Sequence, residues 1–346
     1  MENTILVTGG TGFVGSWVVK KLLEKGYKVR ITVRDKSKHE KYKFLEDIAG
    51  ELSGTLDIYE ADLLIPGAYD EAARGCTGVM HIASPFTLRF KDPVKELIEP
   101  AIKGTENVLQ AASASGTVKK VVLTSSVVAV YGDNIDMQER GLSEFTENEF
   151  NQSSTEKHQP YPYSKVKAEL AAWDIAKKQD QWQLVVINPS FVMGPPLAAS
   201  SNSESIQFMK DLLKGKMLTG APHLEFSYVD VRDVAEAHIL AFENDQAEGR
   251  YILAERVMTV LDLAKIIKNL YPKKYPLPKM EAPKFMLYLI GWAFGLTGKF
   301  ISRNVGHTIN LNNHKSIEGL KLNYTPMETT IKDMIEELKR KQIIKN

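Results

Sequence analysis

Residues 8–15 read TGGTGFVG, and this stretch sets the expectation for the whole fold. A short apolar run precedes it, and the amphipathic stretch 12–25 follows it. A glycine-rich turn between a strand and a helix is typical of a dinucleotide-binding βαβ unit. Gly9 permits the tight turn, Gly12 lets a pyrophosphate approach the backbone, and Gly15 lets the helix pack closely on the strand. The N–H groups that begin the helix are then available to the phosphates.

Short β-branched runs alternate with helical patterns through the first half of the chain. Further strand-like runs lie at 28–33, 56–59, 78–83, 118–125 and 183–188. They are apolar on consecutive positions, which fits strands that helices cover on both faces. The alternation indicates βαβ units and a parallel sheet. We therefore expect an α/β fold, a Rossmann doubly wound parallel sheet with a smaller C-terminal α/β substrate domain.

The strand–helix alternation weakens after Pro189, where proline- and serine-rich loops become frequent. We expect residues 1–190 to form the NADP-binding Rossmann domain, with 225–254 returning to it. Residues 191–224 and 255–346 are expected to form the substrate-binding domain.

Composition excludes several classes of function. The 44 basic and 43 acidic residues leave a net charge of +1, so no global field attracts nucleic acid or a membrane. The single cysteine, Cys76, cannot build a disulfide framework. The seven histidines form no close pair at ligand spacing, so we expect no metal site. The start of the chain lacks a secretion signal, and we expect a cytoplasmic protein, a monomer or a homodimer.

The most apolar late stretch, 285–296, reads FMLYLIGWAFGL. It is too short to span a bilayer as a helix. We expect a buried helix here; a partner surface or a helix lying on a membrane is the less favoured alternative.

The end of the second strand indicates which dinucleotide binds. An acid near this position usually bonds the ribose 2′-hydroxyl of NAD, whereas an arginine accommodates the 2′-phosphate of NADP. Here Arg34 ends the strand and Lys41 follows, which favours NADP(H). Asp35 argues against this assignment, because it is an acid beside the same strand end; it either reaches the ribose or caps the next turn. The alternative for Arg34 is a surface charge. Asp62, after the third strand, is expected near the adenine amino group or as a turn cap.

The stretch PYPYSKVK at 160–167 contains two tyrosine–lysine pairs. Tyr161 lies four residues before Lys165, and Tyr163 lies four residues before Lys167, so each pair shares one face of a helix. An ammonium group beside a phenol favours the phenolate and lowers the tyrosine pKa. Either pair is therefore a candidate proton-transfer site, and the spacing alone does not choose between them.

The fifth strand ends in hydroxyl residues at 124–126, and the carboxyl ends of parallel strands face the ligand crevice. Together with TGGTGFVG at 8–15, ADL at 61–63 and the Tyr-x-x-x-Lys spacing, they make the chain similar to the extended short-chain dehydrogenase/reductase family. The resemblance covers most of the chain and is strongest up to about residue 194.

This family's active-site helix reads Y-x-x-S-K-x-x-A-E, and only the frame that starts at Tyr161 fits it. The resemblance implies that Tyr161 is the general acid, and that Lys165 lowers its pKa and binds the nicotinamide ribose. Ser126 would polarise the substrate carbonyl, which accepts hydride from NADPH. Tyr163 and Lys167 remain the rival pair, interpreted as a packed aromatic and a solvated lysine.

The same resemblance gives a set of expected cofactor contacts around NADPH/NADP+. They are Gly9, Thr11, Gly12, Phe13, Val14, Gly15, Arg34, Lys41, Asp62, Leu63, Ala83, Ser84, Thr124, Tyr161, Lys165, Pro189 and Val192.

Two stretches narrow the branch of the family. HIASPF at 81–86 and NPSFVMGP at 188–195 are similar to segments of the dihydroflavonol, cinnamoyl-CoA and carbonyl (aldehyde) reductase branch. Tyr131 stands where plant flavonoid reductases carry an asparagine, which argues against a flavonoid. The resemblance implies an aldehyde or ketone with a hydrophobic body. Phe86, Tyr131 and Phe191 are candidate pocket residues, and aromatics at such places are as often core.

Two alternative functions stay open. The first is a nucleotide-sugar epimerase or dehydratase with a tightly held NAD(P), against which Arg34 and the 81–86 segment argue. The second is a non-catalytic NADP(H)-sensing protein, against which the intact Tyr161 and Lys165 argue.

Two polar positions are expected to serve the structure first. Asp230 or Asp233 caps the helix that follows, and Asn107 bonds a backbone carbonyl or a water.

Overall fold

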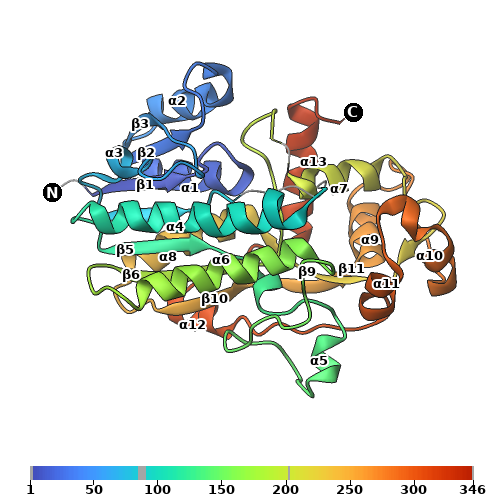
Figure 1. Cartoon of the computed structure of the whole chain (residues 1–346). Helices are drawn as coiled ribbons and strands as arrows, with labels where there is room; N and C mark the ends of the chain where they lie inside the picture. Colours follow the sequence, from blue (N-terminus) through green and yellow to red (C-terminus); the bar gives the residue numbers. More distant parts are fainter. Residues whose placement is uncertain (1–2, 85–90, 202, 345–346) are drawn as a thin grey trace.

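The computed structural model describes residues 3–84, 91–201 and 203–344, without the side chains of 293 and 294. Its centre is a seven-stranded, all-parallel sheet of order β10-β6-β5-β4-β1-β2-β3 (Figure 1). The strands are β1 (Thr4–Thr8), β2 (Lys28–Val33), β3 (Thr55–Glu60), β4 (Gly78–His81), β5 (Lys120–Thr124), β6 (Gln183–Pro189) and β10 (Gly249–Leu253). The predicted Rossmann-type fold is confirmed.

Helices cover both faces of this sheet. One face carries α1 (Phe13–Glu24), α2 (Lys43–Gly50), α8 (Val231–Glu243) and α12 (His314–Leu320). The other carries α3 (Asp70–Ala73), α4 (Glu99–Ala114), which a π-helical turn at Val94–Ile98 precedes, and α6 (Pro160–Ala176). Figure 1 shows α4 and α6 crossing this face next to each other.

The two cores explain why the strands are apolar on consecutive positions. In β1, Ile5 and Val7 pack into the core that contains α1, whereas Leu6 packs into the core on the opposite face. Neighbouring residues of a strand point to opposite faces. Because helices cover both faces of this sheet, all three side chains are fully buried. A sheet buried on both sides therefore needs apolar residues without alternation.

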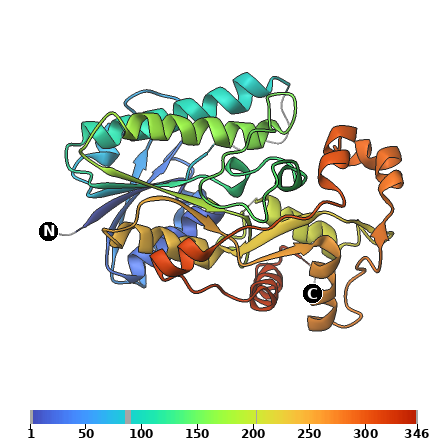
Figure 2. The same ribbon diagram turned by 90° about the horizontal axis from the view of Figure 1, so that it is seen from below.

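A second, smaller sheet of order β11-β9-β7 lies beyond the carboxyl ends of the large sheet, as Figure 2 also shows. Its strands are β7 (Phe191–Met193), β9 (Glu225–Asp230) and β11 (Arg256–Thr259). It packs with α7 (Glu204–Leu213), α9 (Val260–Leu270) and α13 (Met327–Arg340) around a separate apolar core. The short strands β8 (Ala221–Pro222) and β12 (Glu281–Ala282) pair beside it.

The segment 225–254 is divided between the two sheets. Strand β9 belongs to the small sheet, whereas β10 pairs with β6 and α8 packs in the core of α1. The exact division of the chain into domains stays a prediction. Asp230 is the N-cap of α8 and accepts a hydrogen bond from the Arg232 backbone N–H at 2.7 Å, so the expected capping is confirmed.

The expectation of a buried helix at 285–296 is wrong. The segment forms α10 (Lys284–Ile290) and a 3₁₀ turn, Gly291–Phe294, followed by α11 (Gly298–Asn304). Phe285 and Leu289 are 66% and 68% exposed, and only Leu287 of α10 is buried. A helix of two turns that packs along one side leaves its other apolar side chains in solvent. Nowhere in the described ranges is a helix long and apolar enough to cross a membrane.

Candidate active site

The glycine turn between β1 and α1 has the geometry of a cradle for a phosphate group. Gly9 adopts a positive φ of 68°, which L side chains rarely adopt. A Cβ on Gly15 would lie 2.1 Å from the Gly9 carbonyl oxygen, and one on Gly12 would lie 3.2 Å from it. Gly12 is the N-cap of α1, so the first N–H groups of the helix lie at a turn in which three of the four residues 9–12 are glycines. Thr11, Phe13 and Val14 line this turn, half-buried.

The ends of β1 and β4 are held together beside the turn. The Thr8 hydroxyl accepts hydrogen bonds from the backbone N–H groups of Ile82 and Ala83 at 3.2 and 3.1 Å. Its own proton is then directed to Nδ1 of His81, 2.8 Å away. Burial, with the nearby charge of Lys165, lowers the pKa of His81 to about 3, so this ring is neutral. Ser84, another predicted cofactor contact, follows in the same segment and is half-buried.

Arg34 and Lys41 lie where a 2′-phosphate is expected. Arg34 directly follows β2, and both side chains are exposed. Asp35, the dissenting acid, accepts hydrogen bonds from the Ser37 backbone N–H at 3.0 Å and from the Ser37 hydroxyl at 2.5 Å. Its carboxylate is therefore engaged in capping the turn, and the basic side chains are the groups offered to solvent at this strand end.

Asp62 and Leu63 follow β3 in a tight turn. The Asp62 carboxylate accepts a hydrogen bond from the Leu64 backbone N–H at 2.8 Å, which is the turn-capping alternative considered above. Asn107 on α4 donates from its amide nitrogen to the Leu63 carbonyl at 2.7 Å, the backbone contact that was expected. The adenine contact of Asp62 stays a prediction.

The three hydroxyl residues after β5 serve different partners. Nδ1 of His238 faces the Val234 carbonyl at 2.7 Å and so carries the proton, which leaves Nε2 to accept from the Thr124 hydroxyl at 2.7 Å. Ser125 is buried and donates to the Glu169 carboxylate at 2.5 Å. Ser126 is only partly buried, and its hydroxyl makes a longer contact, 3.3 Å, with the Pro189 carbonyl. Ser126 is therefore the serine that is best placed to turn toward a substrate.

Glu169 connects the catalytic helix to the ends of β5 and β6. Besides Ser125, it accepts a hydrogen bond from Asn188 at 3.0 Å and pairs with Arg250 at 2.6 Å between Nε and Oε1. Asn188 also donates to the Ser126 carbonyl at 3.1 Å. Glu169 and Arg250 are 1% and 5% exposed, and a buried ion pair with this many hydrogen bonds fixes its surroundings.

Tyr161 and Lys165 lie one turn apart at the start of α6, and the charge of Lys165 acts on His81, the last residue of β4. The Lys165 Nζ is 5.8 Å from the centre of the Tyr161 ring. Lys165 is 8% exposed, although it is a lysine. The rival pair has the same spacing, with Lys167 Nζ 5.2 Å from the Tyr163 ring, but Lys167 is only half-buried.

The expectation that Lys165 lowers the Tyr161 pKa is wrong for the structure as it stands. Burial raises the pKa of Tyr161 above its usual value. Burial also lowers the pKa of Lys165 to about 8, which Glu169 partly counteracts. Desolvation thus outweighs the attraction between the two groups. The phenol holds its proton at neutral pH, which is the form that a general acid needs.

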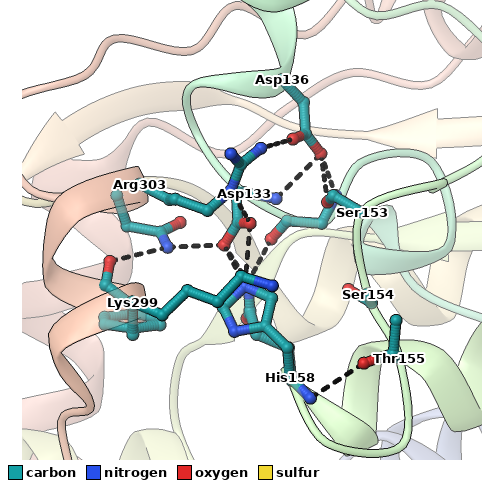
Figure 3. Close-up of polar contacts among 12 residues, drawn as sticks. Asp133, Asp136, Ser153, Ser154, Thr155, His158, Lys299 and Arg303 are labelled. Atoms are coloured by element: carbon teal, nitrogen blue, oxygen red, sulfur yellow. Dashed lines mark hydrogen bonds and ion pairs between the residues drawn. The ribbon is translucent and has the colours of Figure 1, made fainter.

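A buried polar cluster sets the direction from which the chain enters α6 (Figure 3). Asp133, fully buried, pairs with Nε2 of His158 at 2.9 Å and with Nε of Arg303 at 2.6 Å. It also accepts hydrogen bonds from the side chains of Gln159 and Asn304 at 2.5 and 2.7 Å. Gln159 has a φ of 56° and directly precedes α6, so its conformation orients the helix that carries Tyr161. This cluster joins the loop after Ser126 to α11.

No pattern in the sequence predicted this cluster or the role of Glu169. Each depends on residues far apart in the chain, such as Asp133 and Arg303. Glu169 stood within the quoted motif, and its place one turn after Lys165 was the available signal.

The candidate pocket aromatics are placed differently from one another. Tyr131 is 7% exposed and stacks on Phe145 with ring centres 5.0 Å apart, so it belongs to a core. Phe191 is half-buried and meets Phe208, Phe226 and Tyr228 at ring distances of 5.6 to 6.0 Å. Phe86 lies outside the described residues.

Pro189 and Val192 flank the Ser126 side of the site. Pro189 ends β6 and is buried, and Val192 lies in β7 and is half-buried. Within the ranges that the structure covers, no group of three or more His, Cys, Asp or Glu side chains is arranged to hold a metal ion.

These features together define the class of protein. The chain belongs to the NAD dependent epimerase/dehydratase family, whose model matches residues 5–254. It is 37% identical to cinnamoyl-CoA reductase CAD2 of Medicago truncatula over 99% of this chain and 97% of that protein. It is also 37% identical to dihydroflavonol 4-reductase of Gerbera hybrida over 79% of this chain and 74% of that protein. The predicted resemblance to this reductase branch is confirmed.

Solved structures agree with the sequence relatives. The Gre2–NADPH complex from Candida albicans is 31% identical, with a TM-score of 0.76, and the match covers 98% of this chain and 99% of that one. A likeness of the fold alone, at 18% identity and a TM-score of 0.71, extends to MoeE5 in complex with UDP-glucuronic acid and NAD, with 98% and 99% of the two chains covered.

Proposed function

We propose that the protein is an NADPH-dependent oxidoreductase that reduces an aldehyde or a ketone to an alcohol. The observation that carries this proposal is the Tyr161–Lys165 pair, one helical turn apart on α6, with Lys165 only 8% exposed and the same helix joined through Glu169 to Ser125, the neighbour of Ser126. Similar proteins are named as reductases of cinnamoyl-CoA, of dihydroflavonol and, in yeast Gre2, of methylglyoxal and isovaleraldehyde, which supports a carbonyl substrate. We further propose a cytoplasmic location and a monomer or homodimer.

The residues present fit NADPH. A Cβ at Gly9, Gly12 or Gly15 would fill the turn where the pyrophosphate is expected, and α1 offers its N-terminus to it. Arg34, which directly follows β2, and Lys41, in the turn His39–Lys41, are exposed cations that would hold a 2′-phosphate. Lys165 would bind the nicotinamide ribose. When bound, NADPH supplies the hydride that the carbonyl carbon receives.

The residues of the chain supply the proton and hold the carbonyl. Ser126 donates a hydrogen bond to the carbonyl oxygen, which polarises it. Tyr161, protonated at neutral pH, transfers its proton to the same oxygen as negative charge develops there. The phenolate that forms is stabilised by the ammonium group of Lys165 and regains a proton from solvent. The carbonyl thus gains one hydride and one proton and leaves as an alcohol.

Consumption of NADPH against a panel of aldehydes, α-keto esters, diketones and aryl ketones tests this function. We expect NADPH oxidation in a one-to-one ratio with the alcohol formed, and a preference for NADPH over NADH. An epimerase or dehydratase returns its cofactor to the starting state and would consume none. Sugar nucleotides in the same panel, with product analysis, test that alternative. Binding of NADPH without turnover of any compound would instead favour the non-catalytic sensor.

A further inference from the structure

Seven of the twelve large apolar side chains that are exposed in the described structure lie within residues 280–292. This α10 surface consists of Met280, Phe285, Met286, Tyr288, Leu289, Ile290 and Trp292, which are 40–78% exposed. Scattered exposed apolar residues are ordinary, but a contiguous patch marks an interaction site. Figures 1 and 2 place α10 at the edge of the molecule, beyond the small sheet and away from the seven-stranded sheet.

Contacts with the α11 region fix the orientation of α10, so its apolar side chains stay exposed. Leu287 packs into a small core with Ile301 and Val305 of the α11 region. The Lys284 ammonium group donates to the backbone carbonyls of Val305 and Ser302 at 2.6 and 3.3 Å. A rotation of the helix that buried Leu289 would break both sets of contacts.

The surroundings of the α10 surface are basic. Lys273, Lys274, Lys279 and Lys299 are exposed in the flanking segments. The only acid in the sequence from 271 to 302 is Glu281, and it pairs with His223 at 2.8 Å. The net charge of +1 for the whole chain therefore conceals a local excess of positive charge.

The exposed apolar side chains and the flanking lysines together distinguish between two possible partners of the α10 surface, a second copy of the chain and an anionic lipid surface. A second copy bound through the same face around a twofold axis would bring the lysines of each copy toward one another. An anionic lipid surface instead offers acyl chains to the aromatic and aliphatic side chains and phosphates to the lysines. Exposed tryptophan and tyrosine are also the side chains that favour the boundary between apolar and aqueous phases.

We propose that the α10 surface docks the protein on anionic membranes. In this arrangement α10 lies in the plane of the interface without crossing the bilayer. The expectation of no membrane partner rested on the overall charge and on burial of this segment, and the second of these is wrong.

Vesicle flotation tests the proposal directly. The full chain is mixed with vesicles of phosphatidylcholine alone, or of equimolar phosphatidylcholine and phosphatidylglycerol. We expect binding to the anionic vesicles, a blue shift of the Trp292 emission that Trp292→Phe removes, and release by salt. Since each lysine near an anionic surface contributes roughly fivefold in partitioning, the double variant Lys279→Glu/Lys299→Glu is expected to bind weakly.

The apolar contribution is tested by Phe285→Glu/Leu289→Glu, which is expected to reduce binding by roughly tenfold or more. Ile317→Glu, at a 41% exposed position of α12, is the matched control and is expected to bind like the wild type. Circular dichroism and melting temperature verify that all variants fold. Absence of binding, or equal binding to neutral vesicles, would overturn the proposal. So would a dimer in solution that Leu289→Glu dissociates, because the occupant would then be a second copy.

Discussion

At the scale of single residues, burial is the dominant influence on the chemistry. Lys165 and Tyr161 are both withdrawn from water, so each is shifted toward its neutral form. The neutral phenol suits a proton donor, and the pKa of Lys165 near 8 leaves it mostly charged at neutral pH. Below a pH of about 8, the Lys165 ammonium group is thus charged when the Tyr161 phenolate forms.

Reduction is therefore expected to slow as pH rises through about 8, where Lys165 loses its charge. The Glu169 carboxylate raises the pKa of Lys165, so Glu169→Gln should lower that pKa and move the decline to lower pH. The measurement is kcat/KM for reduction as a function of pH. Asp174→Asn, at an exposed position of the same helix, is the control and should leave the profile unchanged. A profile that Glu169→Gln does not move would contradict this role.

Arg34 is expected to select the cofactor. A hydrogen bond to a charged group contributes about 1.5–3 kcal/mol, so Arg34→Ala should raise KM for NADPH by roughly tenfold to a hundredfold. The KM for NADH should change little, because NADH has no 2′-phosphate. Lys43→Ala, which removes an exposed cation paired with Asp47, is the control. Equal losses with both cofactors would show that Arg34 acts on folding or on another part of the nucleotide.

At the scale of elements, the helix α6, which carries Tyr161, is positioned at its start and in its middle turns. Glu169 attaches its middle turns to β5 and β6. The Asp133 cluster fixes the chain that enters it, through His158 and Gln159. The same cluster contains Arg303 of α11, so the C-terminal half of the chain contributes to the placement of Tyr161.

Asp133→Asn is expected to lower the free energy of unfolding by about 3 kcal/mol, since it removes the buried carboxylate that pairs with Arg303 and holds the side chains of His158, Gln159 and Asn304. It should lower kcat more than it raises KM, because Tyr161 is displaced. Glu139→Gln is a matched control: Glu139 pairs with the same Arg303 but is 48% exposed, so its loss should cost far less stability. Urea unfolding and steady-state kinetics give both quantities. Similar losses for the two variants would argue against a special role of burial at Asp133.

At the scale of the whole molecule, the cofactor turn and the active-site helix meet at the carboxyl ends of one sheet. Ligand binding there should stabilise the native state as a unit. NADPH at a hundred times its dissociation constant should add about 2.7 kcal/mol to the free energy of unfolding. For a chain of this size that corresponds to a rise of roughly 5 °C in melting temperature. NADH at the same concentration should give a smaller rise, and a larger one would contradict the proposed cofactor.

The parts of this account that were predictable from sequence are local. The glycine turn and the order of strands and helices each depend on residues within a short stretch, whereas the frame that starts at Tyr161 comes from the family resemblance and stays a prediction. The networks around Asp133 and Glu169 join residues 19 to 171 positions apart, and no local pattern signals them. The exposure of α10 and the raised pKa of Tyr161 depend on what packs nearby, so the sequence pattern alone gave the wrong direction for both.

The most direct test of the central claim compares Tyr161→Phe with Tyr163→Phe in the NADPH oxidation assay, using the best carbonyl substrate found. Both substitutions remove only a hydroxyl, and both leave the lysine four residues later in place. The account predicts that Tyr161→Phe loses turnover while it still binds NADPH, and that Tyr163→Phe retains most of the wild-type rate. Full activity of Tyr161→Phe, or loss of activity in Tyr163→Phe alone, would contradict it.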